Sequence, residues 1–167
     1  MDMNKKVIVV NSDFSPISVI TWKRAINLIL KGRAEIVEKS EEVIKNFEGT
    51  VQFILPKVIK LVNFVKHVFK ARISFTRKNV IIRDRHTCQY CNAKENLSID
   101  HVIPYAKGGT STWHNCVAAC AKCNHLKGSR SLKECGLTLK IKPKEPTLTE
   151  FIKAKIETLN IQSQFTF

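Results

Sequence analysis

The chain contains two Cys-x-x-Cys pairs, Cys88/Cys91 and Cys120/Cys123, separated by 28 residues. Each pair forms a tight turn that directs two sulfurs at one point, and four such thiolates can close a tetrahedral Zn²⁺ site. The spacer is longer than that of a minimal zinc ribbon, so it must hold secondary structure of its own. We therefore expect a structural zinc site built around a folded insert.

The insert carries an Asp100-His101 pair within the largely apolar residues 97–104. A structural zinc ion needs only its own ligands, so this pair calls for a second explanation. Residues 97–104 and 115–119 are predicted to be the strands of a hairpin, joined by a loop that contains Gly108-Gly109. Successive strand side chains point to opposite faces, so Asp100 and His101 can share one site only at a twisted or bulged strand end.

The 167 residues, 44% of them hydrophobic, indicate a globular protein of one domain or two small ones. Its apolar runs are too short to span a bilayer, and the apolar run 7–10 is too short for a signal peptide. We therefore expect a cytoplasmic protein with no membrane partner. Its six cysteines are then metal ligands or free thiols rather than disulfides.

The net charge of +14 is spread along the whole chain. Thirteen lysines and arginines oppose seven acidic residues in segment 1–75, and fifteen oppose seven in segment 76–167. A role in solubility is one reading, but an excess of this size on a small protein favours a polyanionic partner, most commonly nucleic acid.

We divide the chain into an N-terminal α/β unit of open role (1–75), a cysteine-containing domain (76–142), and a C-terminal linker and helix (143–167). In the first unit we expect strands at 7–10, 33–37 and 51–55, the last ended by Pro56, and a helix from Thr21 to Gly32. Beyond it we expect helices at 76–84, with Thr76 as N-cap, at 124–133, and at 150–159, with Thr149 as N-cap.

Several short motifs occur in a fixed order around the cysteines. They are Arg83-Asp84, Cys88-Gln89-Tyr90-Cys91, Ile99-Asp100-His101-Val102-Ile103-Pro104, Gly108-Gly109, Trp113-His114-Asn115 and Cys120-Ala121-Lys122-Cys123-Asn124-His125-Leu126-Lys127-Gly128. This stretch resembles the HNH endonucleases that carry a four-cysteine zinc site. The resemblance covers residues 77–142 in detail and extends loosely to the N-terminus, where Asn11, Phe14-Ser15-Pro16 and Trp22 are similar to stand-alone bacterial members.

The resemblance implies an α+β protein in which a ββα-metal (His-Me finger) nuclease motif, stapled by the zinc site, follows the small α/β unit. It implies that His101 is the general base for water, a role that suits imidazole because it titrates near neutral pH. It assigns Asp100 to a catalytic divalent ion, although a salt bridge to a nearby lysine or arginine is an alternative. Asn115 would steady the loop and orient His101, or serve as an ordinary turn residue.

The third letter of the family motif falls at Asn124, where many members carry histidine, so the chain is an HNN variant. An amide oxygen is a hard ligand, which favours Mg²⁺ or Mn²⁺, while a helix-capping role for Asn124 is an alternative. Lys127 lies one helical turn further and is expected to face the same side and hold a phosphate. Arg130, Lys107 and Arg77 would extend this DNA-binding surface, or be plain solvated charges.

The sequence therefore predicts a metal-dependent HNH endonuclease that nicks or cleaves double-stranded DNA, with structural Zn²⁺ and catalytic Mg²⁺ or Mn²⁺. Two alternatives stay open: a non-catalytic, zinc-stapled nucleic-acid-binding protein, and a ribonuclease that uses the same site. No residue pattern predicts the preferred target sequence or the oligomeric state.

Overall fold

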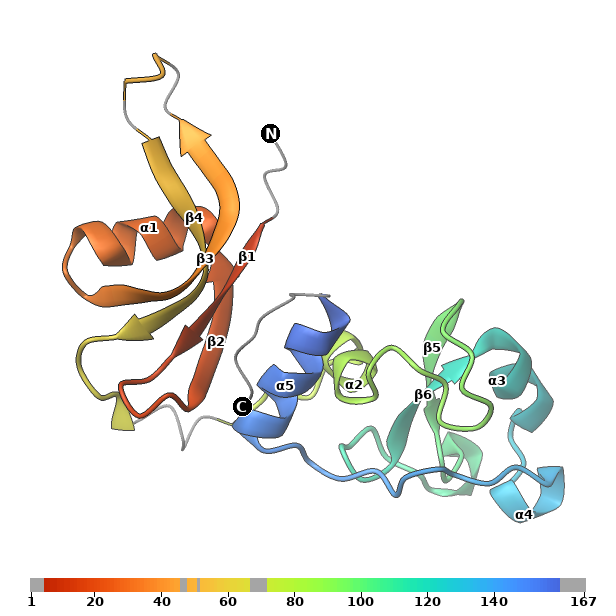
Figure 1. The fold of residues 1–167 in the computed structure, drawn as a ribbon. Coiled ribbons are helices and arrows are strands. Elements are labelled where there is room, and N and C mark those ends of the chain that lie inside the picture. Colours follow the sequence, from red (N-terminus) through yellow and green to blue (C-terminus); the bar gives the residue numbers. More distant parts are fainter. Residues whose placement is uncertain (1–4, 46–47, 51, 67–71, 160–167) are drawn as a thin grey trace. The chain divides into compact units, whose positions relative to one another are not determined.

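The computed structural model describes residues 5–45, 48–50, 52–66 and 72–159. The protein has mixed α+β architecture (Figure 1) and two compact units, residues 1–71 with 155–167, and residues 72–154. The predicted segment boundaries at residues 75 and 142 stay a prediction. Within the described ranges, no helix has the length and apolar character needed to cross a bilayer.

The first unit is built on a four-stranded sheet with the strand order β2-β1-β4-β3. β1 pairs antiparallel with β2 and parallel with β4, and β3 pairs antiparallel with β4. The elements are β1 (Lys6–Val10), β2 (Pro16–Thr21), α1 (Trp22–Leu30), β3 (Ala34–Lys45) and β4 (Gln52–Leu61).

The core of this unit lies between the sheet and α1. Val7 and Val9, two residues apart on β1, share one face and pack with Ile59 of β4 and Ala25 of α1, all of them buried. Ala25 has no exposed surface, so a small side chain marks the place where the helix approaches the strands. The unit is thus the α/β body that the apolar pattern of residues 7–30 predicts.

The capping residues predicted the bounds of α1 correctly, but the predictions for β2 and β4 were wrong. Thr21 is the N-cap residue of α1, and Gly32 follows the helix with a φ of +64°. The strand β2 was not predicted, and Pro56 lies inside β4 instead of ending it. Pro56 is tolerated because the β3–β4 register is irregular there and β1 pairs with β4 only from Val58 onward.

The second unit contains the predicted hairpin, β5 paired antiparallel with β6, and several short helices. The pairing is in regular register from Leu97↔Cys120 to His101↔Cys116, so no bulge is present at Asp100. The elements are α2 (Arg77–Arg83), β5 (Leu97–His101), the 3-10 turn η2 (Tyr105–Lys107), β6 (Cys116–Cys120), α3 (Ala121–Lys127) and α4 (Leu132–Cys135). The helix α5 (Leu148–Thr158) begins in this unit, and its residues from Lys155 onward are grouped with the first unit.

The helices of this unit differ from the prediction after Cys123. The expected helix 124–133 is two helices, because Gly128 ends α3 at a φ of +52° and Ser131 starts α4 with a capping box. α5 begins after Thr147, whose hydroxyl accepts a hydrogen bond from the Glu150 N–H at 3.2 Å, so Thr149 is not the cap. The cap of α2 was predicted correctly, since the Thr76 side chain accepts from the Asn79 N–H.

A buried ion pair fastens α2 to β6. Arg83 and Asp84 form two parallel hydrogen bonds of 2.8 and 3.0 Å. Arg83 also donates to the Cys116 carbonyl at 2.7 Å, and Asp84 accepts from the Ala118 N–H at 2.7 Å. The pair therefore sets the position of the fully buried strand β6, from which α3 continues.

Candidate functional site

The four predicted zinc ligands lie together. The Sγ atoms of Cys88, Cys91, Cys120 and Cys123 are all within 4.8 Å of one another, and those of Cys91 and Cys120 are 3.7 Å apart. A Zn–S bond of about 2.3 Å places the sulfurs of a regular tetrahedron about 3.8 Å apart, so the sulfurs fit the ion. The predicted grouping of the four cysteines is confirmed.

The thiols of this cluster differ in how readily they ionise. Burial by itself raises the pKa of the Cys88 thiol, but backbone hydrogen bonds from Cys120, Cys91 and Tyr90 outweigh it and lower that pKa to about 7. Burial and the neighbouring thiols raise the pKa of Cys123. A cation that binds all four sulfurs must therefore displace protons, which couples metal binding to pH.

A separate cavity of about 360 Å³ is lined by four of the predicted site residues, Asp100, His101, Asn124 and Lys127. Asp100 and His101 line it from β5, and Asn124 lines it from α3. His101 is the last residue of β5, so a strand end, without a bulge, lets consecutive side chains reach one cavity. Two segments separated by 22 residues of sequence are thus brought to one place.

The Asp100 carboxylate is buried, and each of its two oxygens has a polar partner. One oxygen accepts a 2.5 Å hydrogen bond from the Tyr90 hydroxyl, and the other lies 3.0 Å from the Lys127 ammonium. Burial, and then the hydrogen bond to Asp100, raise the pKa of Tyr90, so its hydroxyl keeps its proton and donates it. The salt bridge that the sequence left open for Asp100 is therefore present.

Lys127 differs from its expected surface position. Its side chain is 1% exposed, and the ammonium donates to the Asp100 carboxylate and, at 2.7 Å, to the His101 carbonyl. Helical periodicity predicted the side on which Lys127 lies, but β5 covers that side. A buried ammonium with these two partners does not present a free charge to a phosphate.

The His101 imidazole is half-buried and held from two directions. Its Nε2 atom lies 2.8 Å from the Ser111 hydroxyl, and its ring meets the Tyr105 ring edge-on at a centroid distance of 5.6 Å. When Nε2 carries the proton and donates it to Ser111, Nδ1 is the ring atom that can accept one. The surroundings thus fit an imidazole held in one orientation.

Asn115 closes the loop between the two strands. Its Oδ1 atom accepts from the Ile103 N–H at 2.8 Å, and its Nδ2 atom donates to the carbonyls of Ile103 at 3.1 Å and Thr110 at 2.9 Å. Gly109 lies directly against this clamp, where a Cβ atom would collide with the Ile103 carbonyl oxygen. These contacts fit a residue that positions the segment after His101.

Asn124 is half-buried on α3, and its Nδ2 atom donates to the Ser98 hydroxyl at 2.9 Å. Ser98 and Asp100 are two residues apart on β5 and therefore share a face, which α3 covers. The N-cap residue of α3 is Cys120, so Asn124 does not cap that helix. Its Oδ1 atom is the group that could bind a cation.

The other predicted DNA-binding residues lie at different places on the unit. Arg130 follows α3 and donates to the Leu126 carbonyl. Lys107 forms an ion pair with Glu134 at 2.6 Å, and Arg77 is exposed at the first residue of α2. Of the three, Lys107 is the one whose charge is already matched within the unit.

Sequence reasoning did not single out three polar residues that contact the site: Tyr90, Ser98 and Ser111. Ser98 could have been found from its spacing, because residues two apart on a strand face the same way. Ser111 follows the Gly108-Gly109 turn closely, but no local pattern shows that the loop returns to His101. Tyr90 lies between two cysteines, and no local pattern shows that its hydroxyl reaches Asp100.

Comparison with known proteins agrees with this arrangement. Residues 88–130 match the family described as HNH endonuclease, and residues 7–69 match the family described as HNH endonuclease-associated, N-terminal domain. A "CRISPR-associated endonuclease Cas9" from Corynebacterium diphtheriae is 35% identical over 63 residues, which cover 35% of this chain but only 6% of that protein. No solved structure matches the chain.

The cysteine cluster, the β5–β6 hairpin with α3 across it, and the two family matches together define an HNH endonuclease domain. The chain therefore carries an HNH endonuclease domain, and an HNH-associated domain precedes it in the sequence.

Proposed function

We propose that this protein is a metal-dependent endonuclease that hydrolyses DNA phosphodiester bonds, with residues 76–142 as its nuclease domain. The observation that carries the proposal is the shared cavity of Asp100, His101 and Asn124. Histidine, carboxylate and amide are the groups that water activation and phosphate charge stabilisation need, and they meet beside a scaffold of clustered cysteines.

In this proposal His101 takes a proton from water. Ser111 holds Nε2, which leaves Nδ1 to accept the proton. The water oxygen attacks phosphorus in line, the bond from phosphorus to the 3′ oxygen breaks, and that oxygen leaves with the bonding electron pair and takes up a proton from solvent water. The products are a 5′-phosphate end and a 3′-hydroxyl end. Asn115 acts as a positioning residue, because it clamps the segment that follows His101.

Asp100 and Asn124 would hold the catalytic ion. A Mg²⁺ or Mn²⁺ ion at this place supplies positive charge for the phosphate oxygens. The donors fit, because each carboxylate oxygen of Asp100 has a lone pair beyond its present bond and Asn124 keeps its amide oxygen. Two protein ligands suit Mg²⁺, which usually retains several waters.

Zn²⁺ would be the ion in the four-cysteine cluster, as a scaffold that joins residues 88–91 to the end of β6 and the start of α3. Arg130, Lys107 and Arg77 remain the proposed DNA-binding residues. The net charge of +14 supports binding to a polyanion such as DNA. Lys127 has a different proposed role, as the counter-ion that keeps the buried Asp100 carboxylate in place.

Substitution of His101 tests the proposal. We expect His101→Ala to lower Mg²⁺-dependent nicking of supercoiled plasmid by about 10²- to 10⁴-fold, the contribution of a general base, while the zinc content stays that of the original chain. His114→Ala, at an exposed histidine outside the cavity, is the matched control and should nick normally. Nicking by His101→Ala at the control rate would refute the role of His101.

A parallel assay on RNA of the same sequence decides the substrate class. Faster cleavage of RNA than of DNA at equal salt would replace the DNA proposal by a ribonuclease. Nucleic-acid binding without any cleavage, over a panel of divalent ions, would favour the non-catalytic alternative.

A further inference from the structure

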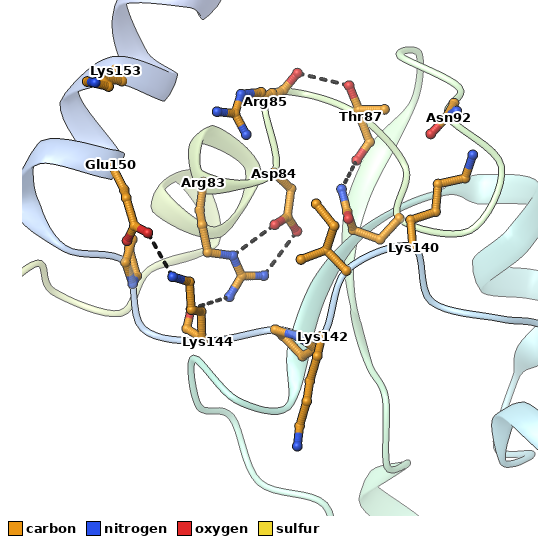
Figure 2. Close-up of a pocket in the computed structure, with 14 residues that line it drawn as sticks. Arg83, Asp84, Arg85, Thr87, Asn92, Lys140, Lys142, Lys144, Glu150 and Lys153 are labelled. Carbon is orange, nitrogen blue, oxygen red and sulfur yellow. Dashed lines mark hydrogen bonds and ion pairs between the residues drawn. The ribbon is translucent and has the colours of Figure 1, made fainter. Parts of the chain in front are cut away.

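The second unit has another cavity, of about 410 Å³, that shares no lining residue with the cavity of His101 (Figure 2). Its lining residues come from the end of α2 with the loop 84–92 that follows, from the irregular residues 140–146, and from the first turns of α5. The proposed cleavage mechanism uses none of them.

The lining of this cavity is strongly cationic. Six of its residues are lysine or arginine and two are acidic, and each acid already has a partner inside the cavity. Asp84 pairs with Arg83 at 2.8 Å, and Glu150 pairs with Lys144 at 2.7 Å (Figure 2). An excess of positive charge is therefore left over for an anionic ligand.

Two exposed lysines, Lys140 and Lys142, supply the available charge. Neither ammonium has a hydrogen bond or ion pair to any other residue in the described part of the chain. Between them lies Ile141, a large apolar side chain that is 63% exposed. A ligand that matches two lysines with an isoleucine between them has an apolar or planar part next to an anion. A nucleotide unit has both parts.

The residues that form the cavity are held in place without a ligand. The Lys140 N–H donates to the Gln89 carbonyl at 3.1 Å, and Arg83 donates to the Lys144 carbonyl at 3.3 Å. Segment 140–146 is thus tied to the rest of the unit at both ends. A preformed cavity of this kind loses little conformational entropy when it binds.

We propose that this cavity is an accessory nucleic-acid site that holds one nucleotide of a strand, with its sugar or base against Ile141. The Lys140 and Lys142 side chains extend in opposite directions (Figure 2), so each would contact one of the two phosphates that flank this nucleotide. The inference rests on the proposed action on nucleic acid, and it adds a contact outside the catalytic cavity. Such a contact would set where a strand lies on the unit without taking part in the cleavage.

The charge part of the proposal is tested by Lys140→Gln with Lys142→Gln, made in the His101→Ala chain so that cleavage is strongly slowed during the binding measurement. The control is Lys94→Gln with Lys133→Gln, two exposed lysines outside both cavities, which removes the same charge. Affinity for a fluorescein-labelled single-stranded oligonucleotide and for its duplex is measured by anisotropy across a series of salt concentrations.

We expect the cavity pair to weaken binding on the order of tenfold more than the control pair. The salt slope should fall by about 1 to 2, because each lost phosphate contact removes about 0.7 to 0.9. Ile141→Ser should weaken binding while leaving the salt slope unchanged, and Leu30→Ser, at an exposed leucine of α1, should have no effect. Equal affinity of the cavity and control pairs would overturn the proposal.

A second binding experiment uses thymidine 5′-monophosphate as the ligand. Binding of this mononucleotide that is lost in the cavity pair, with oligonucleotide affinity unchanged, would assign the cavity to a free nucleotide and overturn the strand proposal. Plasmid nicking by the unsubstituted chain is scored separately. Absence of nicking would refute the proposed endonuclease activity. The comparison of affinities tests the accessory site independently of that activity.

Discussion

Asp100 and Lys127 form an ion pair whose side chains are 6% and 1% exposed, on two segments that the sequence separates by 26 residues. Removing two charges from water costs several kcal/mol per ion, and a buried pair recovers this only with good geometry and further hydrogen bonds. Both conditions are met, since Tyr90 donates to Asp100 and Lys127 donates to the His101 carbonyl. The pair therefore links β5 to α3 at the site.

Removal of the Lys127 side chain should destabilise the folded protein. We expect Lys127→Ala to lower the free energy of unfolding by about 3–5 kcal/mol, because it leaves the Asp100 carboxylate buried without a cation. Chemical denaturation of the zinc-loaded protein gives the value. The control is Lys122→Ala, on the same helix but exposed, which should change stability by less than about 0.5 kcal/mol.

A double variant separates charge from packing. Asp100→Asn combined with Lys127→Met removes both charges and should recover a large part of the stability lost in Lys127→Ala. If Lys127→Ala unfolds like the Lys122→Ala control, the ion pair is not what links β5 to α3.

At the scale of elements, a carboxylate connects η2 to α4. Glu134 of α4 accepts hydrogen bonds from Lys107 of η2 at 2.6 Å and from the Ser131 N–H at 2.6 Å. The hydrogen bond from Lys107, and then those from Ser131, lower the pKa of Glu134 from 4.5 to about 2. A lowered pKa means that the ionised form is favoured in the folded protein, so the contact is complete above pH 4.5 and is lost as the pH falls through about 2.

An NMR titration of the Glu134 carboxyl checks this. We expect a midpoint near pH 2 in the unsubstituted protein, and an upward shift toward 4.5 in Lys107→Gln, because the largest cause of the lowered pKa is then gone. Lys133→Gln, the neighbouring exposed lysine of α4, should leave the midpoint unchanged. A midpoint near 4.5 in the unsubstituted protein would contradict the pairing of η2 with α4.

At the scale of the whole molecule, two compact units have different sources of stability. The sheet of the first unit has an apolar core with α1, whereas an apolar core of the second unit includes three of the four clustered cysteines, Cys88, Cys120 and Cys123. Structural zinc sites contribute folding free energy of about 10–16 kcal/mol in small domains. Loss of the proposed zinc ion should therefore affect the second unit far more than the first.

Hydrogen exchange after chelation tests this difference. We expect a strong chelator, or Cys120→Ser, to remove amide protection in β5, β6 and α3 while β1 and β4 stay protected. Cys135→Ser, at a cysteine outside the cluster, is the control and should keep protection in both units. Equal loss of protection in the two units would show that they unfold as one.

Features that depend on near neighbours in the chain could be predicted from the sequence. The spacing of the cysteines predicted their grouping, a threonine at position 76 predicted the start of α2, and apolar segments 97–104 and 115–119 predicted the hairpin. The order of short motifs predicted the family. In each case the determining interaction spans a few residues or follows from the period of a strand or helix.

Only the tertiary structure decided which side chains are covered and by what. Helical periodicity puts Lys127 on a known side of α3, but its burial depends on β5, which folds back from a distant part of the chain. Pro56 can lie inside β4 because of the pairing of two other strands, and the cationic cavity exists because segment 140–146 crosses the end of α2. Burial and charge compensation depend on contacts between residues far apart in the sequence, and the period of one element does not encode them.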